Sequence, residues 1–345
     1  MKIRMVIFLQ ACLCTFIFLF IAKKILHPPT VDHGTQESTQ ESPPPPQRQS
    51  VTLRDATYTY HLEYPWFLYE YPYLQNYHCS VLLSPQSELT QDPPEPLLLL
   101  AIKSNPWSTN RRSALRQTWA REGMTEGYRV RPIFLMAQVD SVGYMSVVER
   151  ESEEYKDILQ WDFMEDHHNL SLKERCFLEW LHFKMPHVAY VFKGDDDEFV
   201  NPAALVRYIK EYGTPRSLHG AVQHHSIVLR YSKYRVSESL FSNNKYPYFL
   251  SGGGFLLPGA AVPLLYRASQ EIPVFPLDDV YLGFLILASN LTLRDEKRFY
   301  VWGLRFDACR FQEALVVHDI DMENLTTMWR EVQEAKCEPT SVAIK

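Results

Sequence analysis

The chain has 345 residues, 46% of them hydrophobic, which is enough for one large folded domain or two modest ones. Its 35 basic and 41 acidic residues give a formal net charge of −6, so the composition gives no reason to expect nucleic acid as a partner. The sequence has neither a glycine-rich dinucleotide fingerprint nor a phosphate-binding loop with its lysine, so neither of those nucleotide-binding classes is indicated.

The N-terminal part of the chain contains an uncharged apolar segment, Met5–Ala22, which is about long enough to cross the hydrocarbon core of a bilayer. Basic residues lie on both sides of it, and the bulky Phe20 near its end does not suit a signal-peptidase cleavage site. We therefore expect residues 5–22 to be an uncleaved transmembrane signal-anchor rather than a cleaved signal peptide, and residues 1–4 to be a cytoplasmic tail.

The composition changes twice after this anchor. Residues 31–50 are rich in Gln, Ser, Thr and Pro and hold too few apolar side chains to fold, so we expect a disordered luminal stem over residues 23–57. Tyrosines then crowd the chain from Tyr58 to Tyr77. We expect residues 58–95 to form an aromatic arm that packs on the folded domain; the alternative is a platform on which sugars stack.

From residue 96 to residue 345 the pattern alternates between short apolar runs and amphipathic segments. Short apolar runs are typical of buried strands, and the amphipathic segments are typical of helices. We expect strands at 97–102, 132–137, 158–163 and 188–192, and helices at 112–120, 147–157 and 171–184. Strands and helices in alternation imply an α/β fold with a mostly parallel sheet covered by helices on both faces.

Three acids, Asp195, Asp196 and Asp197, follow the expected strand at 188–192 after Gly194. In open α/β sheets ligands bind beyond the carboxyl ends of strands, and adjacent carboxylates repel one another unless a cation or solvent compensates them. Carboxylate oxygens suit Mg²⁺ or Mn²⁺. The run therefore predicts a divalent-cation site; the alternative is a solvated acidic turn.

A second acidic pair, Asp278 and Asp279, opens an apolar segment of helical length that extends to Leu287. The helix dipole stabilises acids at a helix N-terminus without any function, but a carboxylate held near an acceptor hydroxyl could also serve as a general base. Upstream, Gly252 and Gly253 lie in a run of three glycines between apolar segments. Such a run lets the backbone approach a ligand closely, and a plain bulge is the alternative.

Basic side chains that suit phosphate occur on one further segment. Arg112 and Arg116 are one helical turn apart and share a face, after a strand and loop where a nucleotide could dock. Guanidinium groups bind phosphate and carboxylate equally well, so structural ion pairs are the alternative. His318 stands alone after an apolar run, where a histidine is more often structural than a ligand.

Cysteines and glycosylation sequons indicate the compartment. Outside the anchor the sequence has four cysteines, an even number that suggests two disulfides in an oxidising compartment; four free thiols in a cytosolic enzyme are the alternative. Three segments fit the N-glycosylation pattern, with the acceptors Asn169, Asn290 and Asn324. We therefore expect the folded part of the chain on the luminal side of a membrane.

Five blocks of sequence carry a resemblance to known proteins. The blocks are RRSALRQTWA (111–120), NLSLKERCFLEW (169–180), FKGDDDEFVNP (192–202), YPYFLSGGGFLL (246–257) and FPLDDVYLG (275–283). In this order they resemble the animal β-1,3-glycosyltransferase family, which includes β-1,3-galactosyltransferases and β-1,3-N-acetylglucosaminyltransferases. The resemblance covers about residues 97 to 337, and the form of FKGDDD, of LDDVYLG and of the C-terminal VVHDIDMENLTTMWREVQEAKC is nearest to the β-1,3-N-acetylglucosaminyltransferases.

This resemblance implies a GT-A type glycosyltransferase fold, a Rossmann-like mixed sheet with helices on both faces, over residues 96–345 and behind a transmembrane helix. It implies a single-pass type II protein of the Golgi membrane with its catalytic domain in the lumen. The reaction it implies is an inverting transfer from a UDP-sugar donor to an acceptor glycan on a glycoprotein or glycolipid, with Mn²⁺ or Mg²⁺ as cofactor. It leaves a homodimer open.

Carried over position by position, the resemblance assigns roles to individual residues. Asp279 is the expected catalytic base. The expected metal residues are Asp195, Asp197 and His318. The expected donor-binding residues are Lys103, Arg112, Arg116, Asp195, Asp196, Gly252, Gly253 and Asp278. The expected disulfides are Cys79 with Cys176 and Cys309 with Cys337.

Two positions depart from the family pattern. Met185 precedes Pro186 where the family commonly has a cysteine, and Cys176 lies earlier in the same helix. Glu198 follows the third acid where an apolar residue is usual, and this extra carboxylate is either solvated or alters metal affinity. Our main hypothesis is transfer of N-acetylglucosamine from UDP-GlcNAc in β-1,3 linkage to a galactose-terminated glycan in protein glycosylation. The alternatives are a β-1,3-galactosyltransferase that uses UDP-galactose and a non-catalytic Golgi glycan-binding protein.

Overall fold

The computed structural model describes residues 50–85 and 95–337. The chain divides into a unit that ends at Gln47 and a unit from Arg48 to Lys345, and the described residues all belong to the second. The expected cytoplasmic tail, signal-anchor and most of the stem therefore lie outside the described residues. Within the described ranges, no helix is both long and apolar enough to cross a membrane.

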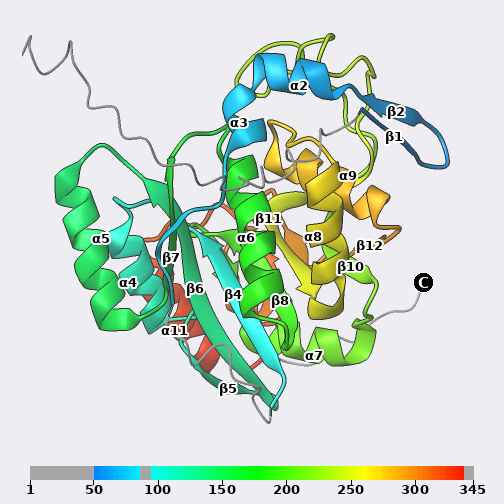
Figure 1. Ribbon diagram of the computed structural model, residues 1–345. Helices are drawn as coiled ribbons and strands as arrows, with labels where there is room; N and C mark the ends of the chain where they lie inside the picture. The colour runs from blue at the N-terminus through cyan, green and yellow to red at the C-terminus, as the bar shows by residue number, and fades with distance from the viewer. Residues whose placement is uncertain (1–49, 86–94, 338–345) are drawn as a thin grey trace, which may run out of the picture. The chain divides into compact units, whose positions relative to one another are not determined.

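In the described chain, nine strands form a central mixed sheet (Figure 1). Their order is β12-β10-β11-β8-β4-β6-β7-β3, and β5 pairs with β6. The strands are β3 (Val81–Leu83), β4 (Leu97–Lys103), β5 (Gly123–Thr125), β6 (Tyr128–Gln138), β7 (Ile158–Met164), β8 (Val188–Asp195), β10 (Ser217–Gln223), β11 (Phe249–Pro258) and β12 (Thr292–Asp295). As expected, β8, β4, β6 and β7 pair in parallel, whereas β11 runs antiparallel to both β8 and β10. Every residue of β4 is buried, which explains its continuous apolar sequence.

Helices cover both faces of this sheet, as the sequence predicted. The helices of this part of the chain are α4 (Thr109–Gln117), α5 (Val142–Tyr155), α6 (Leu170–Lys184), α7 (Pro202–Tyr212), α8 (Val262–Glu271), α9 (Asp278–Ala288), α10 (Ala308–Glu313) and α11 (Leu325–Glu334). Leu97 and Leu99 of β4 join an apolar cluster with residues of α6, α8 and α9, while Leu98 and Leu100 join a second cluster with residues of α4, α5, α7 and α11. In Figure 1, α6 and α8 cross the near face of the sheet.

The folded chain begins earlier than the sequence predicted. β1 (Val51–Arg54) pairs antiparallel with β2 (Thr59–Leu62), so the stem that we expected to end at Thr57 gives way to a hairpin that includes β1. Asp55 fixes the turn between the two strands by accepting hydrogen bonds from the amides of Thr57 and Tyr58, both at 2.7 Å. A strand of four residues is too short for composition to reveal, which is why the stem was predicted to extend too far.

The aromatic arm packs on the folded domain. It contains α2 (Tyr64–Glu70) and α3 (Pro72–Asn76), and Phe67 lies buried in the same apolar cluster as residues of α6 and α9. Gln75 fastens the arm further, because its side chain donates to the carbonyl oxygen of Val274 at 2.9 Å and accepts from the amide of Val274 at 3.0 Å.

Two disulfides cross-link the described residues, and both match the expected pairs. Cys79–Cys176 ties the arm to α6, and Cys309–Cys337 ties α10 to the segment after α11. Cross-links of this kind form and persist in oxidising compartments.

Candidate active site

The acidic run lies where two neighbouring parallel strands end. β8 ends at Asp195 and β4 ends at Lys103, which pairs with Asp195 across the ladder. Lys103 Nζ lies 3.0 Å from Asp195 Oδ1 and 3.6 Å from Asp278 Oδ2. Burial alone would lower the pKa of Lys103, but the charges of Asp195 and Asp278 outweigh burial and raise it well above its usual value. Lys103 is therefore a buried cation that links the two acidic motifs of the sequence.

A small second sheet brings His318 to the acidic turn. β9 (Phe199–Val200) follows the turn and pairs antiparallel with β14 (Val316–Val317), which in turn pairs with β13 (Phe299–Tyr300). His318 is the first residue after β14, and its Nε2 lies 3.6 Å from Asp197 Oδ1. The histidine that stood alone in the sequence is thus a direct neighbour of the acidic run.

The carboxylates of the turn differ in how they are compensated. Asp196 accepts hydrogen bonds from Ser104 Oγ at 2.7 Å and from Arg111 Nη1 at 3.1 Å. Asp197 Oδ1, by contrast, is buried and has no hydrogen-bond partner in the described part of the chain. Burial, followed by the charge of Asp195, raises the pKa of Asp197. Carboxylates crowded in this way are stabilised by a nearby cation.

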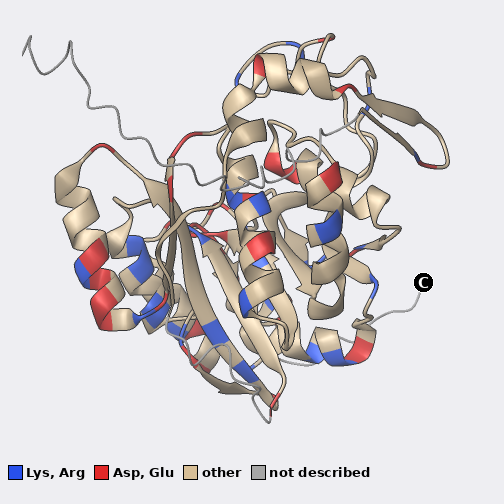
Figure 2. Cartoon of the chain, in the orientation of Figure 1, with Lys and Arg blue, Asp and Glu red and all other residues tan. Residues whose placement is uncertain are grey.

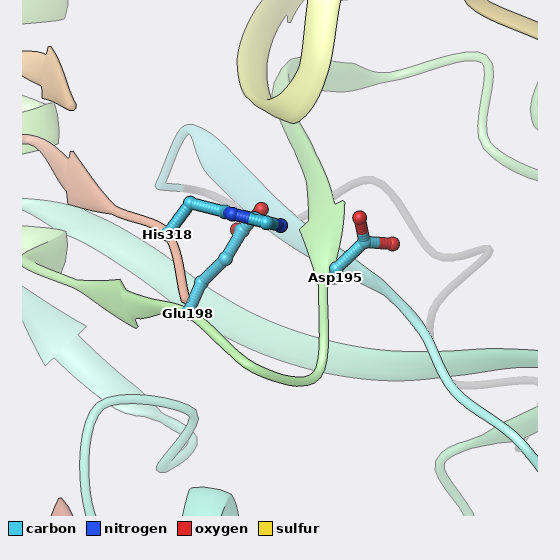
Figure 3. Close-up of side chains that lie close together, drawn as sticks. All are labelled: Asp195, Glu198 and His318. Carbon is cyan, nitrogen blue, oxygen red and sulfur yellow. The ribbon is translucent and has the colours of Figure 1, made fainter. Parts of the chain in front are cut away.

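Three side chains at the turn have the arrangement of a ligand set. One potential ligand atom from each of Asp195, Glu198 and His318 lies within 4.8 Å of the other two (Figure 3). Carboxylate oxygens together with an imidazole suit a divalent cation such as Mn²⁺ or Mg²⁺, so the residues fit the cofactor that the sequence predicted. Glu198 completes this group by distance, and Asp197 Oδ1 also lies 3.6 Å from His318 Nε2, so the roles of Asp195, Asp197 and His318 as metal ligands stay predictions.

The acidic pair Asp278 and Asp279 opens α9, as expected, and its two carboxylates have opposite environments. Burial alone would raise the pKa of Asp278, but the charges of Lys103 and Lys193 outweigh burial and lower it. Burial, together with the charge of Asp278, raises the pKa of Asp279 to about 7. The amide of Gly252 donates to Asp279 Oδ2 at 2.9 Å. One acid is therefore firmly ionised, and its neighbour can gain or lose a proton near neutral pH.

The glycine run makes room for these functional side chains. A Cβ on Gly252 would lie 2.8 Å from Asp279 Oδ1, and a Cβ on Gly253 would lie 3.3 Å from Cδ2 of His318. Gly254 has a φ of +102°, which strains any residue with a side chain. The structure thus explains why glycine occupies these positions, and the contact of Gly252 and Gly253 with a donor stays a prediction.

Two cavities adjoin at these residues. The first has a volume of about 400 Å³ and is lined by Asp195, Asp196 and Asp197 of the acidic turn. The second has a volume of about 430 Å³ and is lined by Asp278 and Asp279. His167 lines both. The first is also lined by Lys103, Ser104, Arg111 and Trp107. The second is also lined by Tyr234, Tyr246, Phe249 and Trp302. A charged cavity beside an aromatic one suits a ligand with an anionic part and a sugar part.

The predicted contact of Arg112 and Arg116 with a nucleotide is corrected by the structure. The Arg112 side chain is fully buried, and its guanidinium lies 2.6 Å from Glu151. Arg116 lies 2.7 Å from Glu151 and 2.8 Å from Asp157. In Figure 2, blue basic segments of α4 lie beside red acidic segments of α5. Both arginines share the inward face of α4 with Leu115, so they form structural ion pairs and lie outside the residues that line the first cavity.

Three residues at the cavities were missed in the sequence analysis: Arg111, His167 and Trp302. Arg111 lies beside the predicted Arg112 but off the buried face of α4, and that helical position was a usable signal. His167 lies in the loop before α6, and Trp302 is 87% exposed on the loop after β13. No pattern in the sequence marked these last two.

The three sequon asparagines occupy different settings. Asn290 and Asn324 are exposed. Asn169 is half-buried, and its Nδ2 donates to the carbonyl oxygen of Met164 at 2.9 Å. Glycosylation of all three stays a prediction, and Asn169 is the least accessible of them.

Known proteins share the sequence of this domain. Residues 110–297 match the galactosyltransferase family model. The mouse β-1,3-galactosyltransferase 5 is 32% identical over 265 residues, which cover 75% of this chain and 85% of that protein. A human acetylgalactosaminyl-O-glycosyl-glycoprotein β-1,3-N-acetylglucosaminyltransferase is 34% identical over 250 residues, 68% of this chain and 65% of that protein. The human UDP-GlcNAc:βGal β-1,3-N-acetylglucosaminyltransferase 9 is 36% identical over 262 residues, again 68% and 65%.

These matches differ in extent. The chain spans most of the mouse relative but slightly less than two thirds of the two human relatives. Two solved glycosyltransferase structures are also similar, a bifunctional glycosyltransferase (TM-score 0.39, 10% identity, 71% of this chain and 51% of that one) and one involved in glycosylation of a viral major capsid (0.38, 12%, 68% and 98%). Those scores are too low to assign a fold type. The family model and the relatives confirm the resemblance seen in the five sequence blocks: the chain belongs to the galactosyltransferase family, together with β-1,3-galactosyltransferases and β-1,3-N-acetylglucosaminyltransferases.

Proposed function

We propose that this protein is an inverting, metal-dependent glycosyltransferase of the GT-A type, which transfers N-acetylglucosamine from UDP-GlcNAc in β-1,3 linkage to a galactose-terminated acceptor glycan. The observation that carries the proposal is the setting of Asp279. It is a half-buried carboxylate whose pKa is raised to about 7, in the wall of an aromatic cavity that adjoins a cavity lined by acids and cations.

Asp279 would act on the acceptor. An acceptor hydroxyl in the second cavity donates its proton to Asp279 as the hydroxyl oxygen attacks the anomeric carbon of the donor sugar. The amide of Gly252 occupies Asp279 Oδ2 and orients the carboxylate, which leaves Oδ1 for the hydroxyl. A general base works best when its pKa lies near the working pH. The exposed ring of Trp302 offers an apolar face on which a sugar can stack.

The first cavity would hold the donor. Arg111 lies at its wall and presents a guanidinium group to a diphosphate, while its ion pair with Asp196 holds it in place. Asp195, Asp197 and His318 would hold Mn²⁺ or Mg²⁺, which when bound neutralises negative charge on the departing diphosphate. Attack from the face opposite UDP converts an α-linked donor into a β-linked product.

The choice of donor sugar rests on the relatives of this chain. Relatives named as N-acetylglucosaminyltransferases are 34% and 36% identical to this chain, and they support UDP-GlcNAc. A β-1,3-galactosyltransferase is the second candidate, because the mouse galactosyltransferase matches over a larger share of its own length.

The location of the protein is part of the same proposal. We place it in the Golgi membrane as a type II protein, anchored by residues 5–22, with the folded domain in the lumen. The two disulfides and the exposed sequon asparagines Asn290 and Asn324 are compatible with an oxidising, glycosylating compartment. A homodimer is a further proposal that size measurement of the detergent-solubilised protein would test.

The deciding experiment is donor profiling of the purified full-length chain. UDP-GlcNAc and UDP-galactose are each offered with a lactose-type acceptor, with Mn²⁺, with Mg²⁺ and with a chelator. We expect transfer of N-acetylglucosamine to the galactose 3-hydroxyl, and loss of transfer in the chelator. Transfer of galactose instead would select the second candidate, and absence of transfer from both donors would reject the proposed transfer to a galactose-terminated acceptor.

A further inference from the structure

Glu198 is a buried acid of the turn whose carboxylate oxygens are left without a close side-chain partner. Its side chain is 0% exposed, and neither carboxylate oxygen makes a hydrogen bond of normal geometry with another described residue. Four other acids of the site have partners: Asp195 contacts Lys103, Asp196 contacts Ser104 and Arg111, Asp278 contacts Lys103, and Asp279 accepts from the amide of Gly252. Asp197 Oδ1 has no hydrogen-bond partner among the described residues but lies 3.6 Å from His318 Nε2. Burying a carboxylate without a partner is costly, so its position requires an explanation.

The backbone around Glu198 fixes where the side chain points. Trp119 Nε1 donates to the carbonyl oxygen of Glu198 at 2.8 Å, and the next residue, Phe199, pairs with Val317 in the small sheet. Gly194 supplies the space, because a Cβ at that position would lie 2.1 Å from Glu198 Oε2. The Glu198 carboxylate therefore packs directly against Gly194 near the end of β8.

Two other potential metal ligands, Asp195 and His318, lie close to the Glu198 carboxylate. Figure 3 shows the Glu198 carboxylate beside the imidazole of His318, with Asp195 across from both. One atom from each of the three lies within 4.8 Å of the other two, close enough for a single ion to reach all three. Two carboxylates carry the charge that a divalent cation neutralises, and an imidazole beside carboxylate oxygens suits Mn²⁺.

We propose that Glu198 is a direct ligand of the divalent cation of this site, together with Asp195 and His318. The inference rests on the proposed metal dependence of the site, but not on the identity of the donor sugar or on turnover. It gives the buried carboxylate a counter-charge and explains why the unpaired oxygens face His318. It also adds Glu198 to the predicted set of Asp195, Asp197 and His318.

The test measures Mn²⁺ binding directly on the full-length protein in detergent. Free Mn²⁺ is followed by electron paramagnetic resonance during titration of the wild type, Glu198→Val and Glu198→Gln. Glu122→Gln is the control, because it removes the same charge at the opposite end of the sheet, where Glu122 pairs with Arg129 near the start of β6. We expect both Glu198 variants to weaken Mn²⁺ binding by at least about tenfold, and the control to bind like the wild type.

Thermal unfolding supplies a second readout that does not depend on activity. Without metal, Glu198→Val should be at least as stable as the wild type, because it removes a buried carboxyl group that has no hydrogen-bond partner of normal geometry. Added Mn²⁺ should raise the Tm of the wild type and of the control, and the rise should be smaller in both Glu198 variants. If Glu198→Val does not fold, the nearly isosteric Glu198→Gln decides.

Wild-type affinity for Mn²⁺ in a folded Glu198 variant overturns the inference, and so does a wild type that does not bind Mn²⁺. Failure of the proposed function gives a different result. In that case the wild type binds Mn²⁺ through Glu198 but transfers neither sugar in the donor-profiling assay.

Discussion

The acidic turn at residues 195–198 and the acidic pair at residues 278–279 differ in how many donors each carboxylate faces. Four consecutive acids share the turn, and two of them, Asp197 and Glu198, keep buried oxygens without partners among the described residues. In the pair, Lys103 lies against Asp278, and Asp279 is left with one backbone amide. The same functional group therefore suits cation binding in one place and proton transfer in the other, because its surroundings differ.

We expect the largest change in activity from a substitution in the acidic pair, at Asp279. Asp279→Asn removes the proton acceptor while keeping the shape of the side chain, so we expect kcat to fall by about 10²- to 10⁴-fold. Binding of UDP and of Mn²⁺ should stay close to wild type, because both depend on the turn. Steady-state kinetics and calorimetric titration measure the two effects separately. Unchanged turnover would remove Asp279 from its proposed role.

We expect a smaller change from a substitution at the acidic turn, where His318 lies beside Asp197. His318→Ala removes the imidazole beside Asp197, so we expect the affinity for Mn²⁺ to fall by about 10- to 100-fold. Saturating Mn²⁺ should restore part of the activity, which it cannot do for Asp279→Asn. A His318→Ala variant with normal Mn²⁺ affinity would separate His318 from the metal site.

The pH dependence of kcat/KM tests the difference between Asp278 and Asp279. The base must be ionised, so kcat/KM should rise with pH through the pKa of Asp279, which is about 7. The charge of Asp278 contributes to that raised pKa, so Asp278→Asn should move this limb to lower pH by about one unit. A limb that stays in place, or moves upward, would contradict the proposed coupling between the two acids.

The raised pKa of Asp279 should also make the stability of the folded protein depend on pH, although this effect is smaller. Asp279 ionises at about 3.8 in an unfolded chain and at about 7 in the folded protein, so its ionisation costs stability progressively as pH rises between these values. The variant Asp279→Asn escapes this cost. Its Tm relative to wild type should therefore be higher at pH 8 than at pH 5, by a few degrees. A difference in Tm between the variant and the wild type that does not change with pH would mean that the pKa of Asp279 is not raised in the folded protein.

The sequence predicted the features that depend on local pattern. Continuous apolar runs located the strands that end at Lys103 and Asp195, and acids after a strand located the turn. The partnership of His318 with Asp197 depends on β14 pairing with β9, more than a hundred residues away in the chain, so the resemblance suggested it but local pattern could not. The environment of Glu198 depends on Gly194 and on the small sheet together, which only the folded structure reveals.

The arginines of helix α4 show which part of the prediction failed within a single helical turn. Arg112 and Arg116 share a face of the helix, which suggested a common phosphate site, but that face also carries Leu115 and continues to the buried Trp119. Spacing of three and four residues marks the side of a helix that is buried. A helical-face analysis would therefore have placed both arginines inward and left Arg111 facing the cavity.

The different settings of Arg111 and Arg112 allow a matched pair of variants, for which we expect the smallest change in activity. Arg111→Ala removes a half-exposed guanidinium that lies 3.1 Å from Asp196 at the wall of the first cavity, so we expect the KM for the UDP-sugar to rise about fivefold with an unchanged Tm. Arg112→Ala should do the reverse and lower the Tm strongly, because it leaves Glu151 buried with one guanidinium partner in place of two. Donor kinetics and thermal unfolding on both variants check the pair. If Arg112→Ala raised the KM at full stability, the arginine would contact the donor after all, and the assignment of α4 to a purely structural ion-pair network would fail.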